Sequence, residues 1–115
     1  MARCAEEPDR VRVAPYLLYR SNHPGWAFYV HRIRMGGTKR WVRGPEDTHC
    51  QMFGFGLTYL PRDLILRFAA TLKEGDMFSD TTFSRWHMRH AEHHNVAIDW
   101  DCHATHLHYE LPAVP

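Results

Sequence analysis

Hydrophobic and polar positions alternate through the first half of the chain, and this pattern predicts β-strands. The four expected strands are rich in β-branched and aromatic residues and span 11–20, 26–35, 38–43 and 48–60. Clusters of turn-forming residues separate them at 21–25, 36–37 and 44–47, and the glycine pair at 36–37 predicts a hairpin. Pro15 should bend the first strand or place it at a sheet edge.

The strand expected at 48–60 has the most regular alternation. Its apolar face would carry Phe53, Phe55, Leu57 and Tyr59. Gly54 and Gly56 would lie on the other face, where the missing side chains allow another group to pack closely. Two glycines inside a strand pattern do not make a nucleotide-binding fingerprint.

After residue 60 the period changes to that of amphipathic helices. A helix is expected over 61–76, with Pro61 near its start and Gly75 ending it. Its predicted apolar side consists of Ile65, Phe68, Ala69 and Leu72. A second helix is expected over 79–95, capped by Ser79 or Asp80, and the strict alternation in 104–112 predicts a final strand.

These elements predict an α+β fold with a mostly antiparallel sheet of about five strands packed by two helices. The length of 115 residues and the 44% hydrophobic content suit a single folded domain over 1–115. The polar residues 1–10 are expected to be loose.

Seven of the ten histidines lie within 87–110, and those on the second predicted helix follow its apolar stripe. At about 100° per residue, His87, His90 and His94 fall within about 40° of Phe83. The charged residues on the opposite side are Arg85, Arg89 and Glu92. If the histidines formed a solvated face, they would lie on the charged side opposite Phe83. They lie on the Phe83 side, so these imidazoles should face the core.

The predicted final strand carries a second histidine set. His106, His108 and Glu110 share one face, with neighbours about 6–7 Å apart, which suits a two-histidine, one-carboxylate metal site. If the helix packs on this strand, the two sets converge. The expected ligands to zinc or another divalent transition metal are then His87, His90, His94, His106, His108 and Glu110.

Other interpretations of these histidines stay open. They could be hydrogen-bonded core groups, the polar outer face of a strand, or acid–base groups that titrate near the ordinary histidine pKa of about 6.5. The sequence has no HExxH motif and no cysteine-pair pattern. Neither enzymatic activity nor any catalytic residue can be assigned from it.

The hairpin expected over residues 31–43 provides a second candidate surface. It places five cations around one aromatic ring: Arg32, Arg34, Lys39, Arg40 and Arg43 around Trp41. A basic β-ribbon with an aromatic side chain can hold a phosphate backbone and stack a base. The same face could also bind an acidic protein partner.

Charge is distributed unevenly although the chain's formal net charge is only +1. Residues 1–60 carry nine Lys and Arg against five Asp and Glu, whereas residues 61–115 carry five against eight. This asymmetry makes head-to-tail association into a homodimer conceivable. The near-neutral total lacks the strong basic excess of typical nucleic-acid-binding domains.

The three cysteines, Cys4, Cys50 and Cys102, form no CxxC motif. His49 and His103 are immediate neighbours of two of them, so their side chains should diverge, and we expect buried structural thiols. No apolar run has the length of a signal peptide or membrane span, which predicts a cytoplasmic protein without membrane attachment.

Two hypotheses of function follow. The first is divalent-metal or small-ligand binding in a histidine-rich C-terminal pocket. The second is a non-catalytic interaction or inhibitor module that uses the basic hairpin. Nucleic-acid binding through the same hairpin is the alternative to a protein partner.

Overall fold

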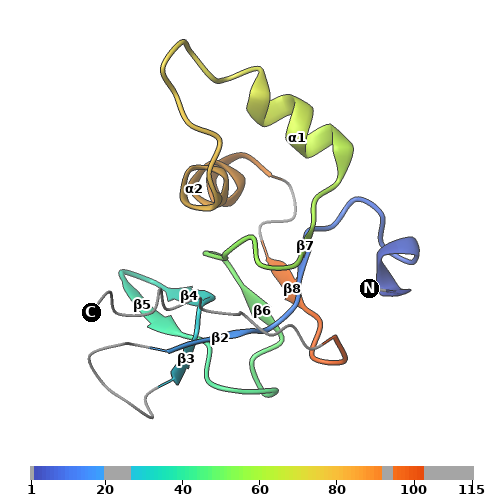
Figure 1. The fold of residues 1–115 in the computed structure, drawn as a ribbon, viewed down its shortest axis with the longest axis vertical. Coiled ribbons are helices and arrows are strands. Elements are labelled where there is room, and N and C mark those ends of the chain that lie inside the picture. The colour runs from blue at the N-terminus through green and yellow to red at the C-terminus, as the bar shows by residue number, and fades with distance from the viewer. Residues whose placement is uncertain (1, 20–26, 92–94, 103–115) are drawn as a thin grey trace, which may run out of the picture.

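The computed structural model of the protein describes residues 2–19, 27–91 and 95–102 (Figure 1). Within these residues it has a short 3-10 helix, two α-helices and eight short strands, so the predicted α+β class is confirmed. In chain order they are η1 (Ala2–Ala5), β1 (Arg12–Val13), β2 (Leu17–Tyr19), β3 (Ala27–Tyr29), β4 (Arg32–Met35), β5 (Thr38–Trp41), β6 (His49–Cys50), β7 (Thr58–Tyr59), α1 (Arg62–Ala69), α2 (Asp80–His90) and β8 (Val96–Ile98). The expected turn at 21–25 and the expected strand at 104–112 lie outside the described residues.

The described strands divide among three small sheets, where the sequence predicted one. One sheet has the order β6-β8-β1-β7, and two hairpins pair β2 with β3 and β4 with β5. All the pairings are antiparallel except that of β1 with β8. The segment 11–20 divides around Pro15, which has no amide hydrogen for a ladder, and the segment 26–35 divides at Val30 and His31.

The continuous strand predicted over 48–60 is wrong, because only its ends form β6 and β7. Between them, Met52 forms an isolated backbone bridge with Arg32. At Phe53 and Gly54, side chains take the backbone hydrogen bonds that a neighbouring strand would have made. The Ser84 hydroxyl accepts from the Phe53 amide at 3.2 Å and donates to the Phe53 carbonyl at 3.1 Å. The Gly54 amide donates to the ring of His31.

The prediction of close packing against Gly54 and Gly56 is confirmed, and the packing group is Tyr16. A Cβ atom on Gly56 would lie 2.5 Å from Cε1 and 2.6 Å from Cζ of Tyr16, well inside van der Waals contact. The two glycines therefore make room for a phenol ring that is itself 6% exposed.

Helix α1 starts after Pro61 as expected but ends at Ala69, several residues before the predicted end. The Thr71 hydroxyl donates to the Phe68 carbonyl at 2.7 Å, which satisfies a carbonyl at the helix end. Gly75, with φ at +89°, belongs to a separate turn in which Asp76 accepts from the Lys73 amide.

The buried side of α1 also differs from the prediction. Phe68 is buried as predicted, and Leu64, which was not predicted, is buried with it. Ala69 is exposed, so the buried face is centred nearer to Leu64 than expected. Ile65 is half-buried at its edge.

Helix α2 begins at the predicted cap. Ser79 accepts a hydrogen bond from the Thr82 amide, and the Thr82 hydroxyl accepts from the Ser79 amide, which completes a capping box. The helix ends at His90 instead of residue 95, because Ala91 is extended with ψ at 142°. The chain then enters β8 at Val96–Ile98, a buried strand that lies between the predicted second helix and the predicted final strand, where no element was expected.

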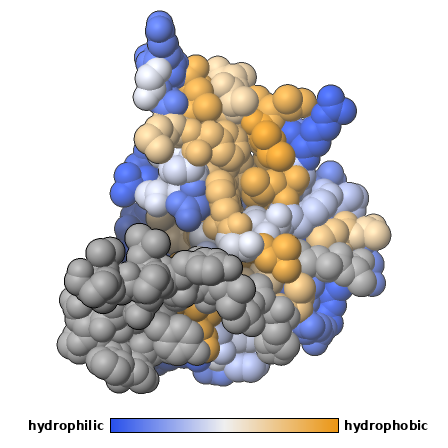
Figure 2. Space-filling view, viewed as in Figure 1, coloured by the Kyte–Doolittle hydropathy of each residue, from blue (hydrophilic) through white to orange (hydrophobic). Residues whose placement is uncertain are grey.

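The core lies between the two helices and the sheet of β6, β8, β1 and β7. Figure 1 shows α1 and α2 together at one end of the molecule, with the two hairpins at the other. Figure 2 shows hydrophobic side chains on the helical end, where Leu66, Met77 and Phe78 are exposed. No helix in the described part of the chain is long and apolar enough to cross a membrane.

Candidate functional site

The helical histidines separate into different environments. His87 faces the core as predicted, with 0% of its surface exposed. Its ring stacks on Phe83 with a centroid distance of 6.0 Å and meets Phe53 edge-on at 6.2 Å. His90 is exposed, so its predicted core-facing position is wrong.

The displacement of His90 has a cause that hydrophobic periodicity does not detect. The buried face of α2 includes Ser84, whose hydroxyl bonds to both backbone groups of Phe53. This polar side chain turns the helix so that Ala91 is buried and His90 lies beyond Trp86, 5.8 Å from its ring.

The rest of the expected metal site, His94, His106, His108 and Glu110, lies outside the described residues. Among residues 2–19, 27–91 and 95–102, no group of three or more His, Cys, Asp or Glu side chains could hold a metal ion. The convergence of the two histidine sets therefore stays a prediction.

The histidine with the best-defined geometry, His31, lies outside the histidine-rich tract. Its ring is fully buried, and Nε2 donates to the Ala14 carbonyl at 2.9 Å while Nδ1 accepts from the Gly54 amide at 3.3 Å. These partners require a neutral ring, because a carbonyl can only accept and an amide hydrogen can only donate. Burial lowers the pKa of His31, partly opposed by the hydrogen bond to Ala14.

His31 thus links the end of β1, the start of β4 and the loop that follows Met52. The sequence contained a signal for this position. In the alternation of 26–35, His31 shares its parity with Tyr29 and Ile33, both of which pack against the core.

The predicted basic hairpin forms, with Gly36 in the turn at φ +59°. Arg32 lies directly opposite Trp41, and Arg34 lies directly opposite Lys39. Because directly paired residues share a face, these four side chains lie together, and we call them the hairpin face. Ile33 lies on the opposite side and packs against the core.

Arg40 does not belong to this group, because it lies on the Ile33 side and binds Asp47. Its two terminal nitrogens contact the two carboxylate oxygens at 2.9 and 2.6 Å, and the Arg43 amide donates to the same carboxylate. The hydrogen bonds from Arg40 are the main reason that the pKa of Asp47 falls to about 2. The predicted cluster of five cations therefore divides, with Arg40 neutralised and Arg43 exposed beyond the end of β5.

The hairpin face combines an ordered aromatic ring with exposed cations. The Arg32 guanidinium lies 4.8 Å above the Trp41 ring, and Phe28 packs against the same ring at 4.7 Å. Trp41 is nevertheless 40% exposed. Arg34 and Lys39 are exposed, and neither forms a salt bridge with a carboxylate of the described residues.

The cysteine whose surroundings are best defined is structural. Cys50 is fully buried, and burial raises the pKa of its thiol, which keeps the unreactive protonated form. This agrees with the expectation of a structural thiol and provides no support for cysteine catalysis at this position.

No protein family, curated protein or solved structure matches the chain. Its function therefore has to be inferred from the geometry and charge of its own residues. Within the described ranges, the hairpin face joins an exposed aromatic ring to cations without carboxylate partners.

Proposed function

We propose that the protein binds single-stranded nucleic acid through the hairpin face. The observation that carries this proposal is the direct pairing of Arg34 with Lys39. Like charges placed opposite each other destabilise a hairpin, and no described carboxylate forms a salt bridge with either one. A phosphate backbone along the strands would supply the missing negative charge.

Trp41 gives the same face a group that can contact bases. Stacking of a base on an aromatic side chain contributes about 1–3 kcal/mol and accepts any base. Arg32 and Phe28 already order the indole ring, so little conformational freedom is lost when a base contacts its exposed part. The planar Arg32 guanidinium offers a second stacking surface.

The composition of the face favours nucleic acid over an acidic protein. Arg and aromatic residues are common at protein–protein interfaces too, but Lys is under-represented there. Here Arg32, Arg34 and Lys39 accompany a single aromatic residue, which is typical of the positively charged surfaces that contact nucleic acid.

The test is fluorescence anisotropy with a labelled single-stranded oligonucleotide of mixed sequence. Trp41→Ala should weaken binding by about 5-fold to 150-fold, the range that loss of one stacked base implies. Lys39→Glu should also weaken binding, whereas Lys73→Glu, an identical charge reversal at an exposed position outside the hairpin, should not.

Equal losses in Lys39→Glu and Lys73→Glu would show only a general charge effect and contradict the proposal. Failure of the wild-type protein to bind the oligonucleotide would contradict it as well. An acidic peptide that binds the hairpin face more tightly than the oligonucleotide does would replace nucleic acid with a protein partner.

A further inference from the structure

Three polar side chains and one alanine form a row across the face of the main sheet that lies opposite the core. In the order β6, β8, β1 and β7, the directly paired residues are His49, Ala97, Arg12 and Tyr59. Directly paired residues project from the same side of a sheet. The alternate positions on the same strands, such as Cys50, Val96 and Val13, are buried in the core on the other side.

Arg12 is the central member of this row and is unusual because its side chain is only 8% exposed. Its terminal Nη2 donates to the Glu7 carboxylate, while its buried Nε has no hydrogen-bond partner among the described residues. Neighbouring Ala97 has only a methyl group, which leaves room for the long side chain. A buried guanidinium needs an anion, because removal of the partner leaves an uncompensated charge out of water.

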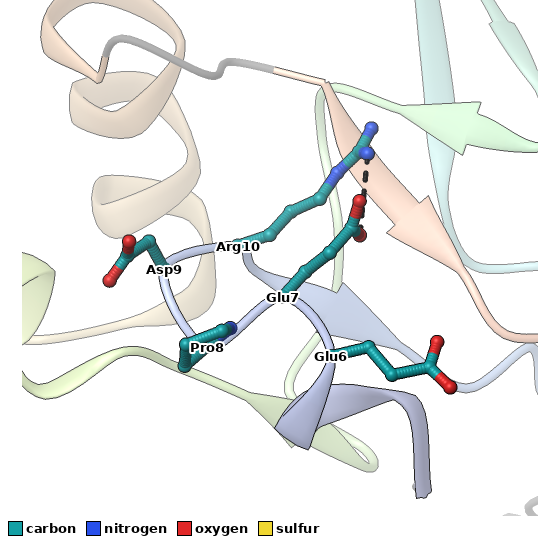
Figure 3. Close-up of a pocket in the computed structure, with 5 residues that line it drawn as sticks. All are labelled: Glu6, Glu7, Pro8, Asp9 and Arg10. Atoms are coloured by element: carbon teal, nitrogen blue, oxygen red, sulfur yellow. Dashed lines mark ion pairs between the residues drawn. The ribbon is translucent and has the colours of Figure 1, made fainter.

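The anion is at present the chain's own carboxylate. Glu7 contacts Arg12 and lies 3.6 Å from Nη1 of Arg10, yet its side chain is 47% exposed. Figure 3 shows Glu7 beside Arg10, while Glu6 and Asp9 point elsewhere. These residues line a cavity of about 280 Å³ formed by residues 6–10.

His49 lies close enough to sense the same charges. Partial burial lowers its pKa, followed by the effect of Arg10, and Glu7 acts in the opposite direction. Its Nδ1 lies 2.9 Å from the Thr48 hydroxyl. The surroundings of Glu7 thus contain two guanidinium groups and an imidazole, drawn from two separate segments of the chain.

We propose that this face is a binding site for the carboxylate group of a small organic acid, and that Glu7 occupies it until such a ligand displaces it. Exchange of one carboxylate for another keeps Arg12 paired throughout, whereas an empty site would leave it without an anion. The partly exposed Glu7 can leave for solvent, but the buried Arg12 cannot. A carboxylate suits the site better than a phosphate dianion, because Glu6 and Asp9, which line the adjoining cavity, repel additional negative charge.

The experiment is titration of the whole protein with acetate, at an ionic strength held constant with chloride, followed by NMR. Glu7→Gln removes the internal competitor. If Glu7 occupies the site nine-tenths of the time, the variant should bind acetate about tenfold more tightly than the wild type. Glu74→Gln makes the same charge change at an exposed residue outside this face and should leave the affinity unchanged.

A second variant avoids dependence on Arg12, whose replacement could prevent folding. Adding Arg10→Gln to Glu7→Gln should weaken acetate binding again while the fold persists. The proposal is overturned if acetate affinity is the same in the wild type and Glu7→Gln, or if Glu74→Gln tightens binding equally. Tighter binding of inorganic phosphate than of acetate would overturn the assignment to carboxylates.

Discussion

Replacing His31 by glutamine should make the stability of the protein less sensitive to acid. The glutamine amide can still donate to the Ala14 carbonyl, but it has no group that titrates near neutral pH. The Gly54 amide loses its acceptor, and a buried unsatisfied amide costs about 1–3 kcal/mol. The variant should therefore be less stable than the wild type at pH 8 but should lose less stability on acidification.

The direction of the pH effect follows from the lowered pKa of His31. Near pH 8 the imidazole is neutral in both the folded and the unfolded chain. Below the ordinary pKa of 6.5, the unfolded chain binds a proton that the folded chain excludes. The free energy of unfolding therefore decreases as the pH is lowered, until the folded-state pKa is reached. One such group contributes at most about 1.4 kcal/mol for each pH unit in this window.

Urea unfolding between pH 8 and 5, followed by tryptophan fluorescence, measures the slope of the unfolding free energy against pH. The pKa of His49 is also lowered, so the informative quantity is the difference in slope between wild type and variant. His90→Gln, at an exposed position of α2, is the matched control. Identical slopes for His31→Gln and the wild type would refute the neutral, doubly hydrogen-bonded state of His31.

Three further outcomes are expected. Gly56→Ala should lower stability by about 1–3 kcal/mol in urea unfolding, because its methyl group overlaps the Tyr16 ring, and an unchanged midpoint would contradict the packing. Between pH 4 and 2, protonation of Asp47 should release Arg40, because a lowered carboxyl pKa contributes stability that is lost as pH falls toward about 2. The protection of β5 amides against hydrogen exchange, measured relative to the unfolded chain at each pH, should then fall in the wild type and stay constant in Asp47→Asn. If the two predicted histidine sets converge, chelator-washed protein should bind one equivalent of zinc with a rise in Tm, and failure to retain or respond to zinc would refute the metal hypothesis.

Features with local causes could be predicted from the sequence. The hairpin at 36–37 requires only a glycine turn between two strands, and the start of α2 requires only the cap residue Ser79. The close packing against Gly56 was also foreseeable, although Tyr16 as the packing group was not. The hairpin turn and the helix cap each depend on residues close together in the chain, and the glycine pattern shows only that some group packs there.

Features that depend on distant pairing could not be predicted in this way. The strand β8 is three residues long, too short for alternation to distinguish it from a loop, and it is formed by pairing with β6 and β1. The row containing Arg12 and His49 exists only through that register. The separation of Arg40 from the hairpin face, in contrast, follows from strand alternation, which points Arg40 away from Lys39 and Trp41.

The salt dependence of oligonucleotide binding measures directly whether the hairpin face contacts a phosphate backbone. Each cation that neutralises a phosphate of a single strand contributes about −0.7 to the slope of log affinity against log salt concentration. Contacts from Arg32, Arg34 and Lys39 should therefore give a slope of about −2, which Lys39→Gln should reduce to about −1.4. Binding that does not depend on salt, or an unchanged slope in Lys39→Gln, would contradict nucleic-acid binding by this face.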